Sequence, residues 1–273
     1  MCRMDLIQTS VCPCQFREGT YTPQGGTEKS PPCGVLNVFQ IMSNKSGKRI
    51  FRFLWRFAVG CVGVSIFFVV LFRFVPVYVT PLMLIRSAEQ LSSGKKLQMK
   101  HHWVSIDAIS RNLALAVVCS EDQNFMDHFG FDFKAIEHSL GASLKADKRL
   151  RGASTISQQT AKNVFLWPSR SWIRKGVEVY FTVLIELVWS KERILEVYLN
   201  SIEMADGVYG AEAASQFYFK TSAKNLSKTQ AAAIAAVLPN PRMYVANPPG
   251  TYIKSRVRWI VRQMDNWGTL KLR

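Results

Sequence analysis

Acidic residues and cysteine are scarce in this sequence. Its 273 residues carry 19 Asp and Glu against 35 Lys and Arg, so the formal net charge is +16. Six cysteines are too few for a dense disulfide scaffold, and 16 glycines are too few for a collagen-like chain. Because 48% of the residues are apolar, disorder throughout the chain is excluded. The basic excess indicates an anionic partner, which can be nucleic acid, a membrane surface or a phosphorylated substrate.

Residues 1–41 show neither helical nor strand periodicity, and they hold four of the six cysteines. Two of these, Cys12 and Cys14, are one residue apart with no histidine nearby, whereas structural zinc sites usually space paired cysteines by about two to four residues. A zinc knuckle is therefore not favoured. Met42 opens a stretch typical of a natural N-terminus, so residues 1–41 are expected to be a disordered tail or sequence upstream of the true start.

A long apolar run follows at residues 57–79. It contains one charge, Arg73, which lies near the far end and can reach the lipid headgroups. These 23 residues are enough for a helix of about 20 residues to cross the hydrocarbon. A cleaved signal peptide would have an apolar region of about 7–15 residues and a small-residue cleavage site, and no such site follows. The run is predicted to be a retained, single-pass membrane anchor.

The charges that flank the run predict its orientation. Residues 42–56 carry five Lys and Arg and no acid, and positive flanks stay in the cytoplasm. Residues 80–273 are therefore expected outside, as one domain with 26 Lys and Arg against 16 Asp and Glu. A basic domain in this position rarely meets nucleic acid, which favours a phosphorylated or lipid-linked substrate. Its only cysteine, Cys119, lies in an apolar run and is expected to be an inert core residue.

Polar caps and apolar residues at helical spacing recur through this outer domain, and no stretch alternates as a half-buried strand would. Ser227 and Gln230 have the spacing of a capping box before an alanine-rich helix that ends at Pro239. The predicted fold class is all-α, with a single transmembrane helix followed by a helical domain. The other helices are expected at 107–120, 133–146, 154–165, 171–189, 191–200 and 251–267.

The first segment that does not fit simple packing is EDQNFMDHFG, residues 121–130. Glu121 and Asp122 close an apolar helix, where the negative end of the helix dipole disfavours carboxylates. Together with partial burial, this field is expected to raise the pKa of Glu121 toward that of a general base. The alternative is a solvated acidic pair at a helix end. His128 is either a ligand or catalytic base, or, more often at such a turn, a structural hydrogen-bonding group.

The second segment is GASTISQQTAKN, residues 152–163. Ser154, Gln158 and Lys162 are four residues apart, so they are expected along one face of a helix. Hydroxyl, amide and ammonium groups together suit sugar hydroxyls and phosphate oxygens. The alternative is an ordinary solvated helix face.

The third segment is the helix expected at 171–189, which is almost entirely apolar around Glu178. A lone carboxylate on a buried helix is costly unless it is paired. Arg174 lies four residues before it and Arg170 four before that, which places all three on one face if the helix begins early. Either this is a structural Arg–Glu pair, or Glu178 is a second site carboxylate held by cations.

Five segments follow one another in the order and spacing of glycosyltransferase family 51. They are EDQNFMDHFG (121–130), GASTISQQTAKN (152–163), RKGVE (174–178), KERILEVYLN (191–200) and AAAIAAVLPNP (231–241). The family is the peptidoglycan glycosyltransferase domain of class A penicillin-binding proteins and of monofunctional enzymes. The sequence resembles the monofunctional branch most closely, over about residues 101–267, and residues 1–41 fall outside the family pattern.

This resemblance implies a lysozyme-like helical fold with a small lobe touching the membrane, and polymerisation of lipid II into β-1,4 glycan strands. By motif position, Glu121 would be the catalytic general base and Glu178 a second catalytic carboxylate that orients the acceptor or the cations. Lys162 and Arg170 would hold the donor pyrophosphate. The other implied substrate-binding residues are Asp122, Phe125, Ser154, Thr155, Gln158, Gln159, Arg174 and Lys175, whereas Glu196 and Asn200 are expected to brace the fold.

The residues agree with this chemistry independently. An α-linked pyrophosphate donor that gives a β-linkage requires inversion in one displacement, and its weakly basic leaving group needs electrostatic stabilisation rather than a general acid. The expected partners are lipid II, the nascent glycan strand, membrane lipids and cell wall synthesis proteins, with no nucleic acid. No metal-ligand cluster is visible, although Mg²⁺ or Mn²⁺ is compatible with the pyrophosphate. The expected location is the cell inner membrane, with a periplasmic catalytic domain.

Two other classes of function share part of this pattern. A lytic muramidase has a helical fold and a catalytic Glu but cleaves glycan, and the 154–159 and 174–178 segments and the anchor argue against it. A non-enzymatic membrane scaffold does not need two separated carboxylates beside a polar stripe. A transpeptidase is excluded more simply, because residues 92–95 match S-x-x-K but no K-T-G or S-D-N follows.

Overall fold

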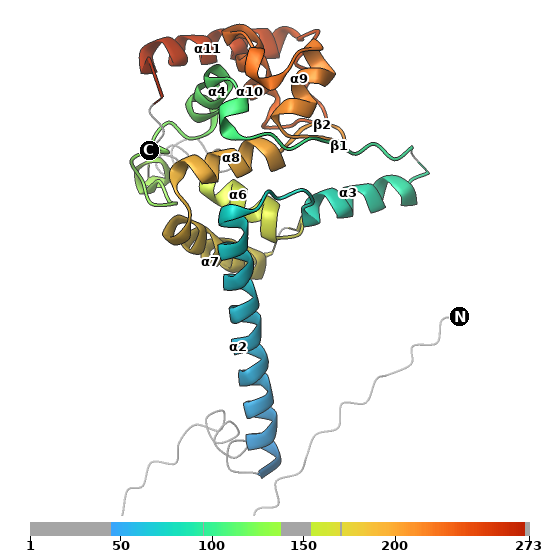
Figure 1. Ribbon diagram of the computed structural model, residues 1–273, viewed down its shortest axis with the longest axis vertical. Helices are drawn as coiled ribbons and strands as arrows, with labels where there is room; N and C mark the ends of the chain where they lie inside the picture. Colours follow the sequence, from blue (N-terminus) through green and yellow to red (C-terminus); the bar gives the residue numbers. More distant parts are fainter. Residues whose placement is uncertain (1–44, 95, 138–153, 170, 271–273) are drawn as a thin grey trace, which may run out of the picture. The chain divides into compact units, whose positions relative to one another are not determined.

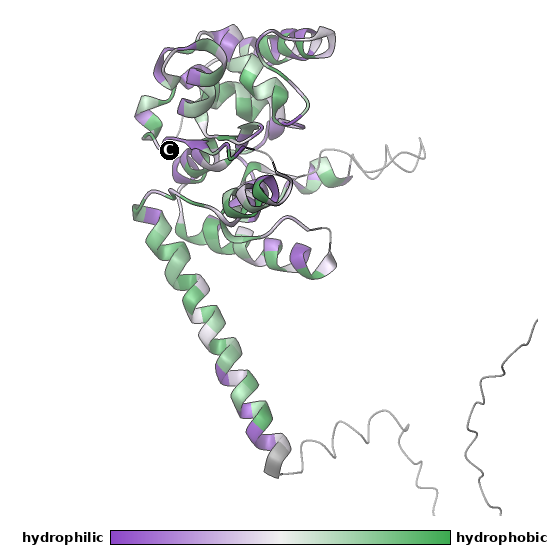
Figure 2. Cartoon of the chain, turned by 90° about the vertical axis from the view of Figure 1, so that its right-hand side faces the viewer, coloured by the Kyte–Doolittle hydropathy of each residue, from purple (hydrophilic) through white to green (hydrophobic). Residues whose placement is uncertain are grey.

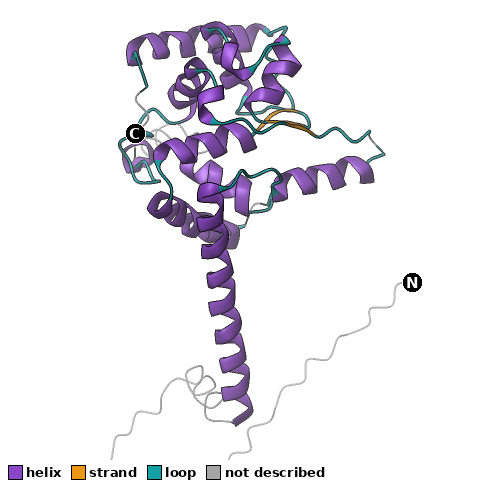
Figure 3. Cartoon of the chain, viewed as in Figure 1, coloured by secondary structure: helices purple, strands orange, loops and turns teal. Residues whose placement is uncertain are grey.

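The computed structural model describes residues 45–94, 96–137, 154–169 and 171–270, and these are mostly helical (Figures 1 and 3). The described residues fall into two units that meet between Ala58 and Val59. The mostly helical fold class predicted from the sequence is confirmed.

The first helix, α2 (Lys45–Phe74), contains the apolar run. Within Gly47–Phe74, an 18-residue window has a mean hydropathy of 2.3 and is 6% buried, so by length and composition the helix can cross a membrane (Figure 2). The predicted span of 57–79 is corrected at its far end, because α2 stops at Phe74, two residues before Pro76. A proline disfavours helical backbone in the residue before it. Val77, beyond the helix, is buried in the core of the second unit.

In its described residues, the rest of the second unit is built from short helices and three very short strands. Its elements are α3 (Pro81–Ser92), β1 (Lys100–His101), η1 (Ile106–Ala108), α4 (Arg111–Glu121), α6 (Ile156–Phe165), α7 (Trp172–Val188), α8 (Lys191–Ser201), β2 (Glu203–Ala205), β3 (Val208–Tyr209), α9 (Ala211–Phe219), η2 (Ala223–Asn225), α10 (Lys228–Val237) and α11 (Thr251–Trp267).

Most of the predicted helices of this unit are present, with boundaries that differ by a few residues. The helix expected at 107–120 is divided by Ser110, which caps α4 by accepting a hydrogen bond from the Asn112 amide. Of the helix expected at 133–146, residues 133–137 are helical and the remainder lies outside the described residues. The sequence missed α3, α9 and the sheet.

Local capping explains why the helices begin where they do. Ser171 and Ser190 each accept a hydrogen bond from the third amide of the following helix, and Ser227 forms the predicted capping box with Gln230. A second capping box, which the sequence analysis did not identify, joins Thr155 and Gln158 at the start of α6. These caps satisfy backbone N–H groups that otherwise lack partners.

The helices form two packed groups around one core (Figure 1). In one group α4 packs against α10 and α11, and in the other α6 packs against α7 and α8. The buried alanines of α10 (Ala231–Ala236 around Ile234) allow a close approach to α4. The Asp122 carboxylate accepts a hydrogen bond from the Ile156 amide at 2.9 Å. The carboxyl end of α4 is thereby held against the amino end of α6.

The small sheet has the strand order β1-β3-β2, with β1 parallel and β2 antiparallel to β3. Strands of two or three residues are too short to show an alternating pattern in the sequence. Gly207, before β3, has a φ of +69°, and a Cβ there would lie 2.2 Å from the Gln98 carbonyl oxygen. The close approach of these two segments therefore requires glycine at this position.

Candidate active site

Glu121 is the last residue of α4, as predicted, and its carboxylate is held by residues of two other helices. Gln159 of α6 donates from Nε2 to Glu121 Oε2 at 3.1 Å. The same amide accepts at Oε1 from the hydroxyl of Tyr198, a fully buried residue of α8, at 3.1 Å. This chain of two hydrogen bonds fixes the orientation of the carboxylate.

Burial raises the pKa of Glu121 above its ordinary value, and the hydrogen bond from Gln159 and the charge of Arg256 oppose the rise. The predicted direction is confirmed, but its main cause is loss of solvent around the carboxylate. A carboxylate with a raised pKa is a stronger base than one in water.

The carboxylate lines a pocket of about 250 Å³ between the end of α4, the following loop and α11. Ser154 lies in the same pocket, exposed and one residue before the Thr155 cap. Trp259 of α11 forms another part of the lining. Glu121 and Ser154, which are both predicted site residues, therefore face one space.

Asp122 has a different role from its neighbour Glu121. It is buried, it accepts hydrogen bonds from His128 Nε2 at 2.9 and 3.0 Å, and it accepts another from the Ile156 amide. Both carboxylate oxygens hold protein groups, and Asp122 also lines the pocket of Glu121, so the substrate contact expected at Asp122 stays a prediction. The structural role expected for His128 is the one observed.

Three more residues that are predicted to contact the substrate are buried, and their substrate contacts stay predictions. Phe125 has no exposed surface, and Lys191 Nζ lies 4.7 Å from the centroid of its ring. Thr155 and Gln158 are buried and form the capping box of α6. The Thr155 hydroxyl also donates to the Gly130 carbonyl at 2.7 Å. These residues hold the loop after α4 in place.

Glu178 of α7 is paired with cations, as both sequence interpretations required. It is 3% exposed, accepts from Arg174 Nη1 at 2.8 Å and forms an ion pair with Lys175. The predicted Arg170 contact lies outside the described residues. A buried carboxylate with two basic partners places surplus positive charge on the adjoining surface.

Lys162 of α6 lies between the two carboxylates. Its pKa is lowered because the surrounding protein displaces water from the amine, although the side chain as a whole is exposed. Arg174 and Lys175 lower this pKa further, whereas Glu178 and Glu121 raise it. The Lys162 ammonium therefore interacts electrostatically with both Glu121 and Glu178.

A pocket of about 450 Å³ adjoins this cation cluster. Lys162, Arg174 and Arg86 contribute its positive charge, and Trp167 and Leu166 are among its apolar lining. Arg86 lies on α3 and was missed by the sequence analysis, since no motif marks that segment. Three cations around one pocket suit a phosphate or pyrophosphate group.

A buried polar cluster lies behind the site. Glu186 of α7 accepts hydrogen bonds from Ser157 and from Lys191 Nζ, and Lys191 also donates to the His128 carbonyl at 2.6 Å. Gly130, with a φ of +74°, packs against Glu186, where a Cβ would come within 3.1 Å. Glu196 and Asn200 of α8 bind the backbone around residues 104–106, which is the bracing role predicted for them.

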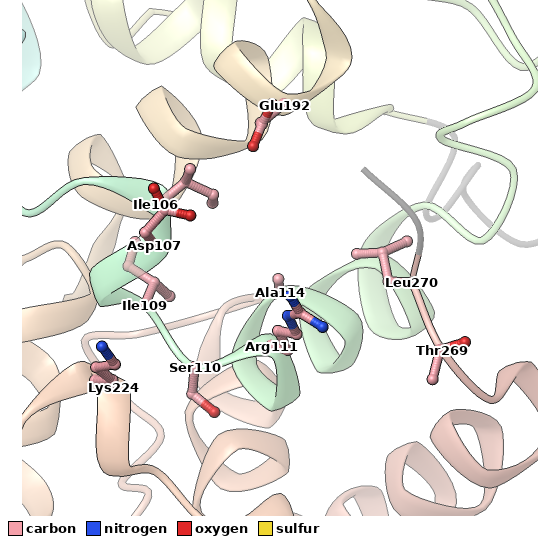
Figure 4. Close-up of a pocket in the computed structure, with 10 residues that line it drawn as sticks. All are labelled: Ile106, Asp107, Ile109, Ser110, Arg111, Ala114, Glu192, Lys224, Thr269 and Leu270. Carbon is pink, nitrogen blue, oxygen red and sulfur yellow. The ribbon is translucent and has the colours of Figure 1, made fainter. Parts of the chain in front are cut away.

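A larger pocket of about 930 Å³ lies at the other end of α4 (Figure 4). Arg111 lines it, and ten residues of helix, about 15 Å, separate Arg111 from Glu121. Glu192 and Leu270 also line it, and none of the predicted site residues does. Across the described part of the chain, no three His, Cys, Asp or Glu side chains gather as metal ligands would.

Comparison with known proteins gives consistent matches over most of the chain. A family model described as Transglycosylase matches residues 88–265. A protein of Bacteroides thetaiotaomicron is 55% identical over 80% of this chain and 88% of its own length. Proteins of Haemophilus influenzae and Chromohalobacter salexigens are 47% and 52% identical, over 85% and 81% of this chain and 95% and 94% of their own lengths. All three carry the name biosynthetic peptidoglycan transglycosylase.

Proposed function

The chain belongs to the transglycosylase family, and we propose that it is a peptidoglycan glycosyltransferase that polymerises lipid II and releases polyprenyl pyrophosphate. The observation that carries the proposal is a pair of pockets, one at the end of α4 beside the cap of α6 and the other along α6 itself. Glu121 lines one of them, held by Gln159, and Lys162 lines the other with Arg86 and Arg174. A base on one side and a cation cluster on the other match an attack by a sugar hydroxyl on a sugar pyrophosphate.

In the proposed step, Glu121 accepts the proton of the acceptor 4-hydroxyl. The hydroxyl oxygen forms a bond to C1 of the donor sugar while the bond from C1 to the pyrophosphate oxygen breaks, with inversion. The leaving pyrophosphate keeps the electron pair, and Lys162 and Arg174 stabilise its charge. A divalent cation on the pyrophosphate remains a proposal, with phosphate oxygens as its main ligands. Cell wall synthesis proteins likewise remain predicted partners.

The cation-lined pocket favours this reaction over glycan cleavage, because a muramidase has no pyrophosphate to bind. We also propose a monofunctional enzyme, because the transpeptidase motifs K-T-G and S-D-N are absent from the sequence. Incubation of the purified protein with labelled lipid II in vesicles should yield polymer and free polyprenyl pyrophosphate. Preformed glycan added without lipid II should not be shortened. Shortened glycan with no polymer from lipid II would favour a muramidase.

The membrane is the proposed setting of this reaction. The apolar α2 is the anchor, and the basic 42–56 flank favours a cytoplasmic N-terminus with the catalytic domain on the periplasmic face of the inner membrane. Within the second unit, the Ser65 hydroxyl of α2 hydrogen-bonds the Tyr180 hydroxyl of α7 at 2.8 Å. Ser65 lies nine residues before the end of α2, about 13 Å along its axis. On this proposal, the part of α7 around Tyr180 lies at the depth of Ser65, within the bilayer rather than at its surface.

The exposed face of α7 suits that depth. Trp172, Ile173 and Leu187 are 91%, 79% and 67% exposed, and Val179 lies between them on the same helix. We call these four residues the α7 apolar stripe. A patch of this kind on a membrane-anchored protein is typical of contact with lipid.

We expect a glutamate in place of Leu187 or Trp172 to slow polymerisation of vesicle-bound lipid II several-fold, because a charge on the stripe opposes contact with the acyl chains. The rate in detergent micelles should change less, since detergent can rearrange around the charge. Met243, 75% exposed in the turn after α10, provides the matched control. If Leu187→Glu and Met243→Glu have equal rates in vesicles, the stripe does not contact lipid.

A further inference from the structure

Arg256 of α11 contacts the same turn of α4 that carries Glu121. Its Nη2 donates to the Ser120 carbonyl at 3.2 Å and lies 3.3 Å from the Ser120 hydroxyl. The last carbonyls of a helix lack intrahelical donors and form the negative end of its dipole. A guanidinium at this position therefore offsets the helix field that acts on Glu121, the next residue.

Trp259 holds this guanidinium in place. The Arg256 guanidinium carbon lies 4.5 Å from the centroid of the Trp259 ring, which is the geometry of a cation–π contact. Trp259 itself lines the pocket that contains Glu121. The α11 pair thus forms one side of the space around the carboxylate.

The contacts of Arg256 are not those of a purely stabilising residue. Its Nε is buried and has no hydrogen-bond partner among the described residues, and an unpaired buried N–H is destabilising. It also forms no ion pair within 4 Å in the described part of the chain. Its charge is left to act on Glu121 through space.

We propose that Arg256, held on the ring of Trp259, is a positioning residue for the carboxylate of Glu121, fixing the end of α4 and favouring the ionised base. The inference rests on the proposed function of Glu121. None of the five segments that resemble the glycosyltransferase family includes α11, so no sequence motif assigns a role to Arg256.

Several charged or titratable groups face Glu121 from the elements around it. Asp122 and Asp132 lie on the loop after α4, Lys162 on α6, Tyr198 on α8 and Arg256 on α11. Asp122 raises the pKa of Glu121 and Arg256 lowers it. Removal of the guanidinium makes protonation of Glu121 more favourable, so the pKa of the base rises and the active, ionised form is lost at a higher pH.

The test is the pH profile of lipid II polymerisation for Arg256→Met. We expect the acidic limb to move to higher pH by about one pH unit, the effect of losing one nearby opposite charge. Below the wild-type midpoint the rate should fall by about tenfold, and it should approach the wild-type rate at alkaline pH. Arg256→Lys keeps the positive charge, so its acidic limb should move less than that of Arg256→Met. The acidic limb of Trp259→Leu should lie between those of the wild type and Arg256→Met.

Arg258→Met is the matched control, because Arg258 is exposed two residues along α11 and its loss changes the net charge equally. Its profile should match the wild type. A loss for Arg256→Met that is the same at every pH, or no loss at all, would overturn the proposal. Failure of the proposed function is distinguishable, because the wild-type protein itself would then form no polymer.

Discussion

Replacement of Glu121 by Gln should lower the rate of lipid II polymerisation by about 10²–10⁴-fold, the usual effect of losing a general base. The larger end is expected, because an unactivated sugar hydroxyl is a poor nucleophile. Gln keeps the size of the side chain and an oxygen that can accept from Gln159 Nε2. Substrate affinity should therefore change much less than turnover. The measurement is single-turnover polymerisation together with lipid II binding.

The folded state should tolerate Glu121→Gln. The pKa of Glu121 is higher in the folded chain than its ordinary value. Ionisation of Glu121 therefore makes folding less favourable as the pH rises from the ordinary glutamate pKa through the raised pKa of the folded chain. Removal of the charge at neutral pH should leave the melting temperature equal to that of the wild type or slightly higher. A variant that melts well below the wild type would show that Glu121 is primarily structural.

Glu178→Gln provides the comparison. Glu178 is buried between Arg174 and Lys175, and the loss of its charge leaves both cations without their carboxylate. Both the melting temperature and the activity should fall. If Glu121→Gln polymerises lipid II at nearly the wild-type rate, the base must be reassigned. The remaining sequence candidates are Asp122 and Glu178, both of which are buried and paired with protein groups.

Replacement of Lys162 by Met should lower turnover by about 10²-fold or more, because the positive charge that stabilises the leaving pyrophosphate is lost. Lys162 is exposed, so the melting temperature should change little. Lys254→Met, at an exposed position of α11, provides the matched control and should retain wild-type turnover. From the sequence alone, Arg170→Met is expected to act in the same way as Lys162→Met. Wild-type turnover in Lys162→Met, or its unfolding, would contradict the assigned role.

The pH dependence of Lys162 gives a sharper test. Because its pKa lies below the ordinary lysine value, the ammonium loses its charge at a lower pH than a solvated lysine does. The wild-type rate should therefore fall on the alkaline side. Lys162→Arg keeps its charge across this range, so the alkaline limb should disappear even if the maximal rate is lower. An alkaline limb that is unchanged in Lys162→Arg would assign it to another group.

Features that depend on neighbours along the chain were predictable from the sequence. The serine caps at 171, 190 and 227 set helix starts, and the apolar run specified a helix able to cross a membrane. The position of Glu121 at the end of α4 was also accessible, whereas its hydrogen bond from Gln159 was not. Burial of Cys119, whose pKa is raised to about 11, followed from its apolar neighbours.

The roles of adjacent residues were decided by contacts between distant segments. Glu121, Asp122 and Phe125 belong to one motif, yet the first is held by Gln159, the second holds the Ile156 amide and the third is fully buried. No local pattern distinguishes them, because each role depends on the packing of α4 against α6 and α8.

Residues that lie far apart in the sequence complete the site. Arg86 joins Lys162 in one pocket, and Arg256 reaches the end of α4 from a position 136 residues after Ser120. Electrostatic and hydrogen-bond effects depend on distance in space, so a sequence can list these cations but cannot say which of them face a carboxylate. The sequence indicated the family and most of the helices and singled out Glu121 as the candidate base, and the tertiary structure decided which charges surround its carboxylate.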